Sequence, residues 1–78
     1  MELILDCSLD PAELHDLLAE ALQFPAWYGK NLDALYDCLT DLNRPVTITV
    51  LYSDRYPGLT SVLEDSMAEN PNLTVYFE

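Results

Sequence analysis

The chain has 78 residues, half of them hydrophobic, so it is long enough for one modest core and too apolar for a disordered acidic tail. The chain has fourteen Asp and Glu residues and only three basic ones, Lys30, Arg44 and Arg55, which gives a formal net charge of −11. This charge disfavours direct binding to nucleic acid or an anionic membrane and favours encounters with basic proteins, although solubility alone also explains an acidic surface.

Neither secretion nor metal binding is indicated by the sequence. Residues 1–6 are too short and too acidic for a signal peptide, and no apolar run is long enough to span a bilayer. Cys7 and Cys38 do not form a CxxC pair, and two cysteines are too few for a metal cage. We therefore expect a cytoplasmic protein without metal or cofactor, whose cysteines are reduced and at least partly buried.

A strand and a first helix are predicted at the start of the chain. Residues 2–6 are mostly apolar and suit a short buried strand. Asp10 is the expected N-cap of the helix, Pro11 its first residue and Glu13 its capping-box acid. The helix is predicted to extend to about residue 22, and its inward face is formed by Leu14, Leu17, Leu18, Ala21 and Leu22.

An aromatic connector leads to a second predicted helix. Pro25 ends the first helix, because proline disfavours helical backbone at the residue before it. Gly29 can supply a positive φ in this connector. Asn31 is the expected N-cap of a helix over residues 32–42, with apolar positions at Leu32, Leu35, Leu39 and Leu42.

The second half of the chain contains two strands around a third helix. Residues 46–51 are largely β-branched and form a strand, and residues 73–77 form the last one. Between them, a helix over residues 59–68 turns Leu59, Val62, Leu63 and Met67 inward. The order β-α-α-β-α-β predicts one two-layer α/β domain over residues 1–78, with a three-stranded parallel sheet and helices mainly on one face.

Nothing in the sequence assembles a catalytic site. His15 is the only histidine, and we expect it on the solvated face of the first helix without a nucleophile partner. Gly29 and Gly58 are the only glycines, so there is no glycine-rich phosphate loop. Ser66 lies in a faint match to the attachment site of acyl carrier proteins, but the two β-branched strands contradict an all-helical carrier. We therefore expect no enzymatic activity.

The second helix is expected to carry an acidic ridge. Asp33, Asp37 and Asp41 recur at i, i+4 and i+8, and like charges at this spacing cost an isolated helix about 0.2–0.5 kcal/mol per pair. Aromatic residues beside fixed carboxylates are typical of interface hot spots. A solvated helix face with core aromatics explains the pattern equally well. The aromatic residues concerned are Trp27, Tyr28 and Tyr36.

These residues also carry a family resemblance. Residues 24–39, FPAWYGKNLDALYDCL, resemble the signature segment of the barstar family, intracellular inhibitors of the ribonuclease barnase. The family pattern is an aromatic pair, Gly, any residue, Asn-Leu-Asp-Ala-Leu, an aromatic residue, Asp and Cys-Leu. The match holds at nearly every position, and the expected order of strands and helices agrees along the whole chain. Outside this segment the resemblance is weaker, and the chain is shorter than barstar around the third helix.

The resemblance implies a mechanism in which the second helix and its preceding loop plug the ribonuclease active site. Asp37 would enter the phosphate pocket, and Asp33 would pair with cations at its mouth. A carboxylate would thus stand in for an RNA phosphate and accept charge-assisted hydrogen bonds from arginine. The other contact residues that the resemblance implies are Trp27, Tyr28, Gly29, Asn31 and Tyr36.

The sequence departs from the family pattern in three places. Trp27 replaces a tyrosine and Tyr36 a tryptophan, which keeps aromatic bulk and is expected to alter the choice of partner. The family's contact glutamate on the third helix falls in the shortened region. Counting back from the last strand places Asp65 there, with Glu64 and Glu69 as alternatives.

The sequence therefore predicts a monomeric, non-catalytic protein that inhibits a basic ribonuclease toxin in a one-to-one complex. It would act as an antitoxin or immunity protein, with no direct nucleic-acid or membrane partner. Two alternatives stay open. The chain could be an acidic module for a basic partner that is not a nuclease. It could also be a DNA mimic, which would need acids spread along an elongated face rather than on one short helix.

Overall fold

Three strands form one parallel sheet in the computed structural model, which describes all residues 1–78. The strands β1 (Glu2–Asp6), β2 (Val46–Leu51) and β3 (Leu73–Phe77) lie in the order β1-β2-β3. Leu5 pairs with Val50, which in turn pairs with Phe77. The predicted three-stranded parallel sheet is confirmed, and the strand bounds agree with the sequence pattern.

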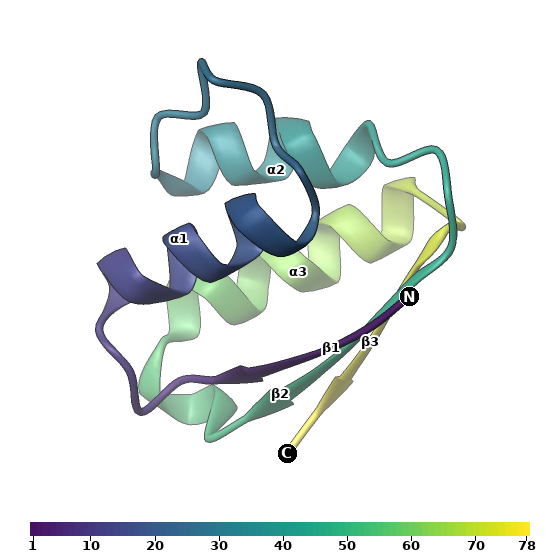
Figure 1. Cartoon of the computed structure of the whole chain (residues 1–78). Coiled ribbons are helices and arrows are strands. Elements are labelled where there is room, and N and C mark those ends of the chain that lie inside the picture. Colours follow the sequence, from purple (N-terminus) through teal and green to yellow (C-terminus); the bar gives the residue numbers. More distant parts are fainter.

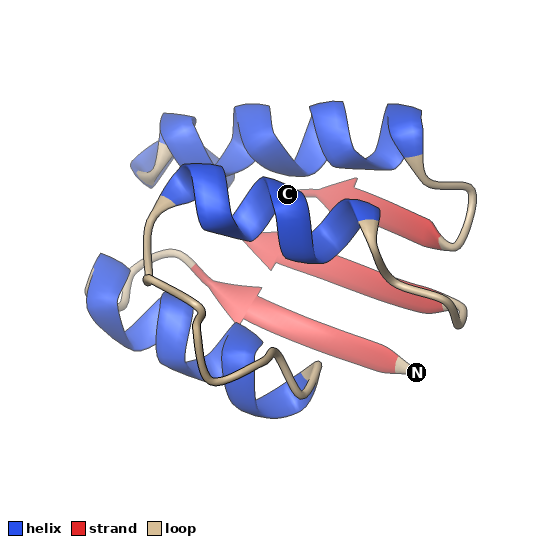
Figure 2. Cartoon of the chain, turned by 90° about the horizontal axis from the view of Figure 1, so that it is seen from above, coloured by secondary structure: helices blue, strands red, loops and turns tan.

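Three α-helices cover one face of this sheet (Figure 1). They are α1 (Pro11–Ala21), α2 (Leu32–Thr40) and α3 (Pro57–Glu69). Figure 2 shows the three strands pointing the same way behind the helices. Both crossovers advance in the same direction across the sheet, and right-handed crossovers of this kind lie on the same face. The two-layer α/β fold and the order β-α-α-β-α-β are thus confirmed, with one addition, the short 3-10 helix η1 (Ser53–Arg55).

The core lies between the helices and the inner face of the sheet. Ile48 and Val50 of the central strand are fully buried there. On the opposite face of the sheet Ile4, Thr49 and Tyr76 lie side by side, and Ile4 and Tyr76 are exposed. The fully buried leucines of the core are Leu5, Leu14, Leu18, Leu35, Leu39, Leu59 and Leu63, and Leu22 and Leu73 are nearly so.

Two residues of α1 lie on the opposite side from the one expected. Leu17, predicted inward, is 39% exposed, whereas His15, predicted on the solvated face, is 5% exposed. The buried face is centred on Leu14, Leu18 and Leu22, which follow one another at intervals of four. His15 lies three residues before Leu18 on the same side, while Leu17 is rotated about 100° from Leu18 towards solvent. Angular position, rather than hydrophobicity, decides which of the two side chains is buried.

The starts of α1 and α3 also differ from the expectation. Asp10 occupies the N-cap position of α1, but its side chain makes no capping hydrogen bond, so the capping box with Glu13 does not form. Both residues are exposed, and water can satisfy the free N–H groups of this helix end. Helix α3 begins at Pro57, two residues earlier than predicted, because proline is readily accommodated in the first turn of a helix.

Candidate functional site

Helix α2 is held at both ends by asparagine side chains. Asn31 Oδ1 accepts a hydrogen bond of 2.8 Å from the Ala34 N–H, which confirms Asn31 as the N-cap. At the other end, the buried Asn70 donates from Nδ2 to the carbonyl oxygens of Leu39 at 2.9 Å and Leu42 at 3.0 Å. These bonds satisfy backbone groups that a helix leaves free at its ends. The Asn31 bond is local to α2, whereas the Asn70 bonds join the C-terminal end of α2 to the end of α3.

Replacing Asn70 by alanine is expected to lower the free energy of unfolding by about 2 kcal/mol, because the buried Leu39 carbonyl oxygen loses its side-chain donor and the Asn72 N–H loses its acceptor. Urea denaturation followed by far-ultraviolet circular dichroism measures this loss. Asn43→Ala is the control, since Asn43 is exposed and its removal is expected to change stability by less than about 0.5 kcal/mol. Equal stabilities for the two variants would contradict the role assigned to Asn70.

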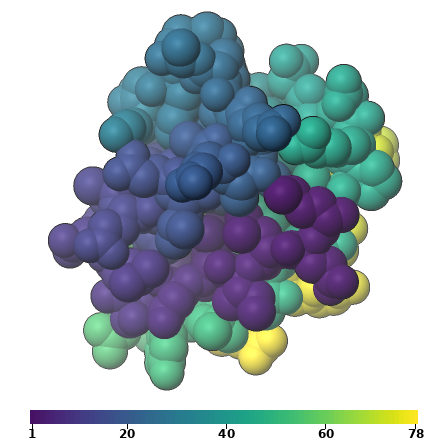
Figure 3. Space-filling model, in the orientation of Figure 1, coloured from purple at the N-terminus to yellow at the C-terminus, as the bar shows by residue number.

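The connector between α1 and α2 carries one aromatic ring outward and another inward. Trp27 is 65% exposed, whereas Tyr28 is 9% exposed. The Tyr28 ring packs edge-to-face on Phe24 with ring centroids 4.9 Å apart. In Figure 3 the connector rises at the top of the molecule, above α1. It therefore presents the indole of Trp27 to solvent on a support anchored by Tyr28.

Gly29 and Lys30 set the path of the chain into α2. The positive φ predicted for Gly29 is found instead at Lys30, where it is 54°. Gly29 is short of space, since a Cβ there would lie 3.0 Å from the side-chain nitrogen of Asn31. The Lys30 ammonium pairs with Asp16 of α1 at 2.7 Å, with both side chains more than half exposed. Lys30 thus faces α1 and does not neutralise the acids of α2.

A buried polar cluster fastens the connector to α1 and α3. His15 Nδ1 is hydrogen-bonded to the Tyr28 hydroxyl, and its Nε2 lies 3.5 Å from the Tyr56 hydroxyl. Burial lowers the pKa of His15 and raises the pKa of Tyr28 to about 12, so both are neutral at pH 7. The prediction that His15 lies on the solvated face is therefore wrong. Its position three residues before Leu18 allowed burial, but Leu17 lies three residues after the buried Leu14, so spacing alone did not distinguish the two residues.

The lowered pKa of His15 predicts a loss of stability in acid. Between its lowered pKa in the folded state and about 6.5, the unfolded chain binds a proton that the folded protein does not. The contribution of His15 is therefore complete above about pH 6.5 and declines as the pH falls below this value. Asp16 raises the pKa and so opposes the effect, while Lys30 lowers it further.

We expect the urea midpoint of the wild type to fall more than that of His15→Gln when the pH is lowered from about 7.5 to about 5.5. The comparison removes the contribution of the carboxylates, which both proteins share. Parallel pH profiles for the two proteins would contradict the assignment of a buried, neutral His15.

The outer face of α2 presents acids that no cation of the chain neutralises. Asp33 and Asp37 are exposed, and Tyr36 is half-buried beside them. Asp41, the third acid of the predicted ridge, is the C-cap of α2 and is also exposed. The one ion pair of the structure lies elsewhere, between α1 and the connector. The ridge is therefore a surface of carboxylates without ion-pair partners on the exposed side of α2.

Helix packing distinguishes between the acids of α3, which runs beside α2 (Figure 1). A Cβ on Gly58 would lie 2.8 Å from Leu32 Cδ1, so this side of α3 faces the start of α2. Glu64 lies on another flank. Because Asn70 joins the far ends of the two helices, Asp65 is level with the middle of α2. The residues that share the side of Gly58 by helical spacing are Val62, Asp65 and Glu69.

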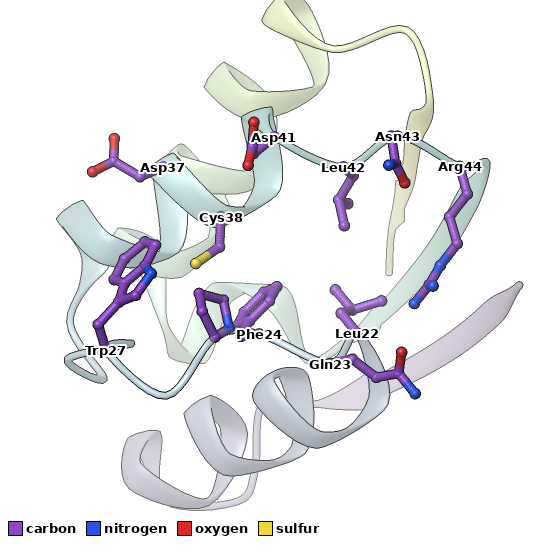
Figure 4. Close-up of a pocket in the computed structure, with 11 residues that line it drawn as sticks. Leu22, Gln23, Phe24, Trp27, Asp37, Cys38, Asp41, Leu42, Asn43 and Arg44 are labelled. Atoms are coloured by element: carbon purple, nitrogen blue, oxygen red, sulfur yellow. The ribbon is translucent and has the colours of Figure 1, made fainter.

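A cavity of about 440 Å³ opens beside the acidic ridge (Figure 4). It could not be predicted from the sequence, because its walls come from segments that only tertiary packing brings together. Burial raises the pKa of the Cys38 thiol, and the charges of Asp37 and Asp41 raise it further, so the thiol stays protonated. The lining residues are Leu22, Gln23, Phe24, Pro25, Trp27, Asp37, Cys38, Asp41, Leu42, Asn43 and Arg44.

The structure speaks against a carrier-type attachment site. Ser66 is fully buried on α3, and its hydroxyl has no hydrogen-bond partner. A modifying enzyme therefore has no access to it in the folded protein. Elsewhere, no three His, Cys, Asp or Glu side chains gather as metal ligands, and none of the helices is long and apolar enough to cross a membrane. Both cysteines are free and buried, as expected.

Comparison with known proteins agrees with this arrangement. The family model described as Barstar (barnase inhibitor) matches residues 1–73. The chain belongs to the barstar family. A relative from Bacillus subtilis (strain 168), named "Putative ribonuclease inhibitor YrdF", is 53% identical over 38 residues. The aligned segment covers 47% of this chain and 42% of that protein, so less than half of either chain is matched.

In this member of the barstar family, the fold brings most of the predicted contact residues to one side. Asp33, Tyr36 and Asp37 share the outer side of α2, and Trp27 lines the same cavity as Asp37. Gly29 and the N-cap Asn31 are exposed between the connector and the helix. Asp65 lies on the neighbouring α3. Tyr28 is the exception, since its ring is buried and positions the connector instead of lying on the surface.

Proposed function

We propose that this protein inhibits a basic, barnase-type ribonuclease by inserting α2 and the preceding connector into its active site. The observation that carries this proposal is the pair of exposed, unneutralised carboxylates on α2, Asp33 and Asp37. They project from α2, which Asn31 caps at its start and Asn70 joins to α3 at its end, in a chain of the barstar family.

The chemistry of inhibition follows from the substrate that is displaced. A ribonuclease active site holds cationic groups around the scissile phosphate of RNA. The carboxylate of Asp37 takes the place of that phosphate, and Asp33 pairs with cations at the rim. Charge-assisted hydrogen bonds from arginine to carboxylate are about twice as strong as neutral ones. Because α2 is already fixed, little conformational entropy is lost when the complex forms.

The aromatic residues beside the acids complete the contact surface. Trp27 is largely exposed and Tyr36 half-buried, so both have area to bury against a partner. Their rings exclude water from the carboxylates, which strengthens the ion pairs they surround. Tyr28 contributes indirectly, by holding the connector against α1. The net charge of −11 speeds the encounter with a basic enzyme.

In this proposal the 78 residues act as one non-catalytic unit, a monomer that binds one ribonuclease molecule. Its biological role is that of an antitoxin or immunity protein, which protects the cytoplasm of the producing cell from the nuclease. Asp65 or Glu69 of α3 supplies a further contact, since both lie on the side of α3 that faces α2.

A fluorogenic RNA-cleavage assay tests the proposal. Barnase-type ribonucleases, including any encoded beside this gene, are titrated with the purified protein. We expect inhibition that is complete at a one-to-one ratio and weakens as salt is added, because salt screens the charges. If no ribonuclease of the panel is inhibited, the proposal fails, and a basic partner that is not a nuclease becomes the better hypothesis for the same surface.

A further inference from the structure

We infer that the cavity beside α2 receives an arginine side chain of the partner, held between the Trp27 indole and the carboxylate of Asp41. This inference rests on the proposed inhibitory function, and it adds a specific pocket and a specific ligand to it. The contact lies outside the acids of the family signature, because Asp41 follows the signature segment, residues 24–39.

Asp41 occupies a position that is unfavourable for the isolated fold. It is the C-cap of α2, where the helix dipole is negative and a carboxylate is destabilising. The last turn of α2 contains no basic residue, and Asp41 forms no ion pair. Asp37, one turn earlier, also lines the cavity and adds a second negative charge. A cation in the cavity would relieve both repulsions at once.

Trp27 gives the cavity a flat aromatic wall. Its indole is 65% exposed, although large aromatic side chains normally bury most of their surface in a fold of this size. Indole is the best natural partner for a cation over an aromatic face. The planar guanidinium of arginine can stack on this wall and bind a carboxylate through two N–H groups, which the compact ammonium of lysine cannot do.

Arg44 determines at which end the cation is held. Figure 4 shows Trp27 and Asp37 at one end of the cavity, Asp41 on its upper wall and Arg44 at the opposite end. Arg44 is exposed and forms no ion pair, so its positive charge disfavours a cation at that end. The volume of about 440 Å³ leaves room for one long side chain and some of its water. The guanidinium is thereby confined to the part of the cavity away from Arg44, between Trp27 and Asp41.

The first test measures inhibition of a ribonuclease that the wild type inhibits. Asp41→Asn keeps the shape of the side chain and removes its charge, and Asp54→Asn on η1 removes an equal charge away from the cavity. We expect Asp41→Asn to weaken inhibition about tenfold relative to Asp54→Asn, mainly through faster dissociation. Inhibition constants for the two variants within a factor of about two would overturn the inference. The proposed function would then still stand on inhibition by the wild type.

The second test needs no ribonuclease. Trp27 is the only tryptophan, so the protein has a single indole N–H resonance, which reports directly on the cavity. We expect N-acetyl-arginine amide to shift this resonance saturably, and the uncharged analogue N-acetyl-citrulline amide to leave it unchanged. Affinity for the arginine compound should fall at least about threefold in Asp41→Asn. No shift, or the same shift with citrulline, would overturn the inference. A shift without any ribonuclease inhibition would support the pocket while the proposed function fails.

Discussion

Asp37→Ala is expected to weaken inhibition of the ribonuclease on the order of 10²- to 10³-fold. Truncating one partner of a buried interfacial ion pair costs about 2–5 kcal/mol, a range to which the barnase–barstar complex itself has contributed. The cost is large because the cations of the enzyme stay buried and lose their counter-charge. The fluorogenic RNA-cleavage titration measures the change as a ratio of inhibition constants.

The stability of Asp37→Ala should change in the opposite direction. Asp37 is exposed, and it lies four residues from both Asp33 and Asp41. Removing it relieves two like-charge repulsions of about 0.2–0.5 kcal/mol each, and alanine is a good helix former. We therefore expect an unchanged or slightly raised urea midpoint together with the loss of inhibition. This combination separates a binding role from a folding defect.

Asp54→Ala is the matched control for Asp37→Ala, since it removes the same charge from an exposed position on η1. It is expected to alter the inhibition constant by no more than about twofold, through weaker electrostatic steering alone. Retained inhibition by Asp37→Ala would contradict the plug mechanism. An equal loss in both variants would assign the effect to overall charge instead of to the acidic ridge.

Leu18→Ala is expected to lower the free energy of unfolding by about 2–5 kcal/mol, whereas Leu17→Ala should lower it by less than about 1 kcal/mol. The two leucines are neighbours on α1, but Leu18 is fully buried and Leu17 is 39% exposed. Truncating Leu18 removes apolar contacts and leaves a cavity, while truncating Leu17 mainly shortens a side chain already in water. The change in intrinsic helix propensity is the same in both variants.

Urea denaturation of both leucine variants measures this difference. For a chain of 78 residues the total stability is about 4–12 kcal/mol, so Leu18→Ala should remove a large share of it. Its apparent inhibitory activity should fall with the fraction that is folded. Equal losses for the two variants would contradict the orientation of α1, and with it the burial of His15 on the same side.

The opposite effects expected for Asp37 and Leu18 distinguish residues that stabilise the fold from residues that serve binding. The buried leucines and the sheet stabilise the fold, whereas the exposed acids of α2 repel one another and are expected to make it less stable. Asp41 at the negative end of the helix is a further case. These acids destabilise the free protein and lie together on one surface. A cationic partner would neutralise their repulsion, and this links their cost in stability to the proposed function.

Much of the fold could be predicted from the sequence, because the signals are local. The alternation of Thr with Val and Ile in residues 46–51 fits one buried and one open sheet face, and the structure has both. Asn31 is identified as an N-cap by its place before a run of leucines, and its side chain makes the expected bond. The segment around Asp37 was enough to indicate the family that the comparison then confirmed.

Other features depended on how the elements pack, and no local signal determined them. The position of α2 and the connector against α1 decides that His15 is buried and that Tyr28 faces inward. The packing of Gly58 against Leu32 decides which acids of α3 lie towards α2. The cavity exists only because the end of α1, the connector and the loop after α2 converge. In each case the deciding contacts join residues far apart in the chain, so periodicity within one element could reveal the element itself but not which of its sides would be covered.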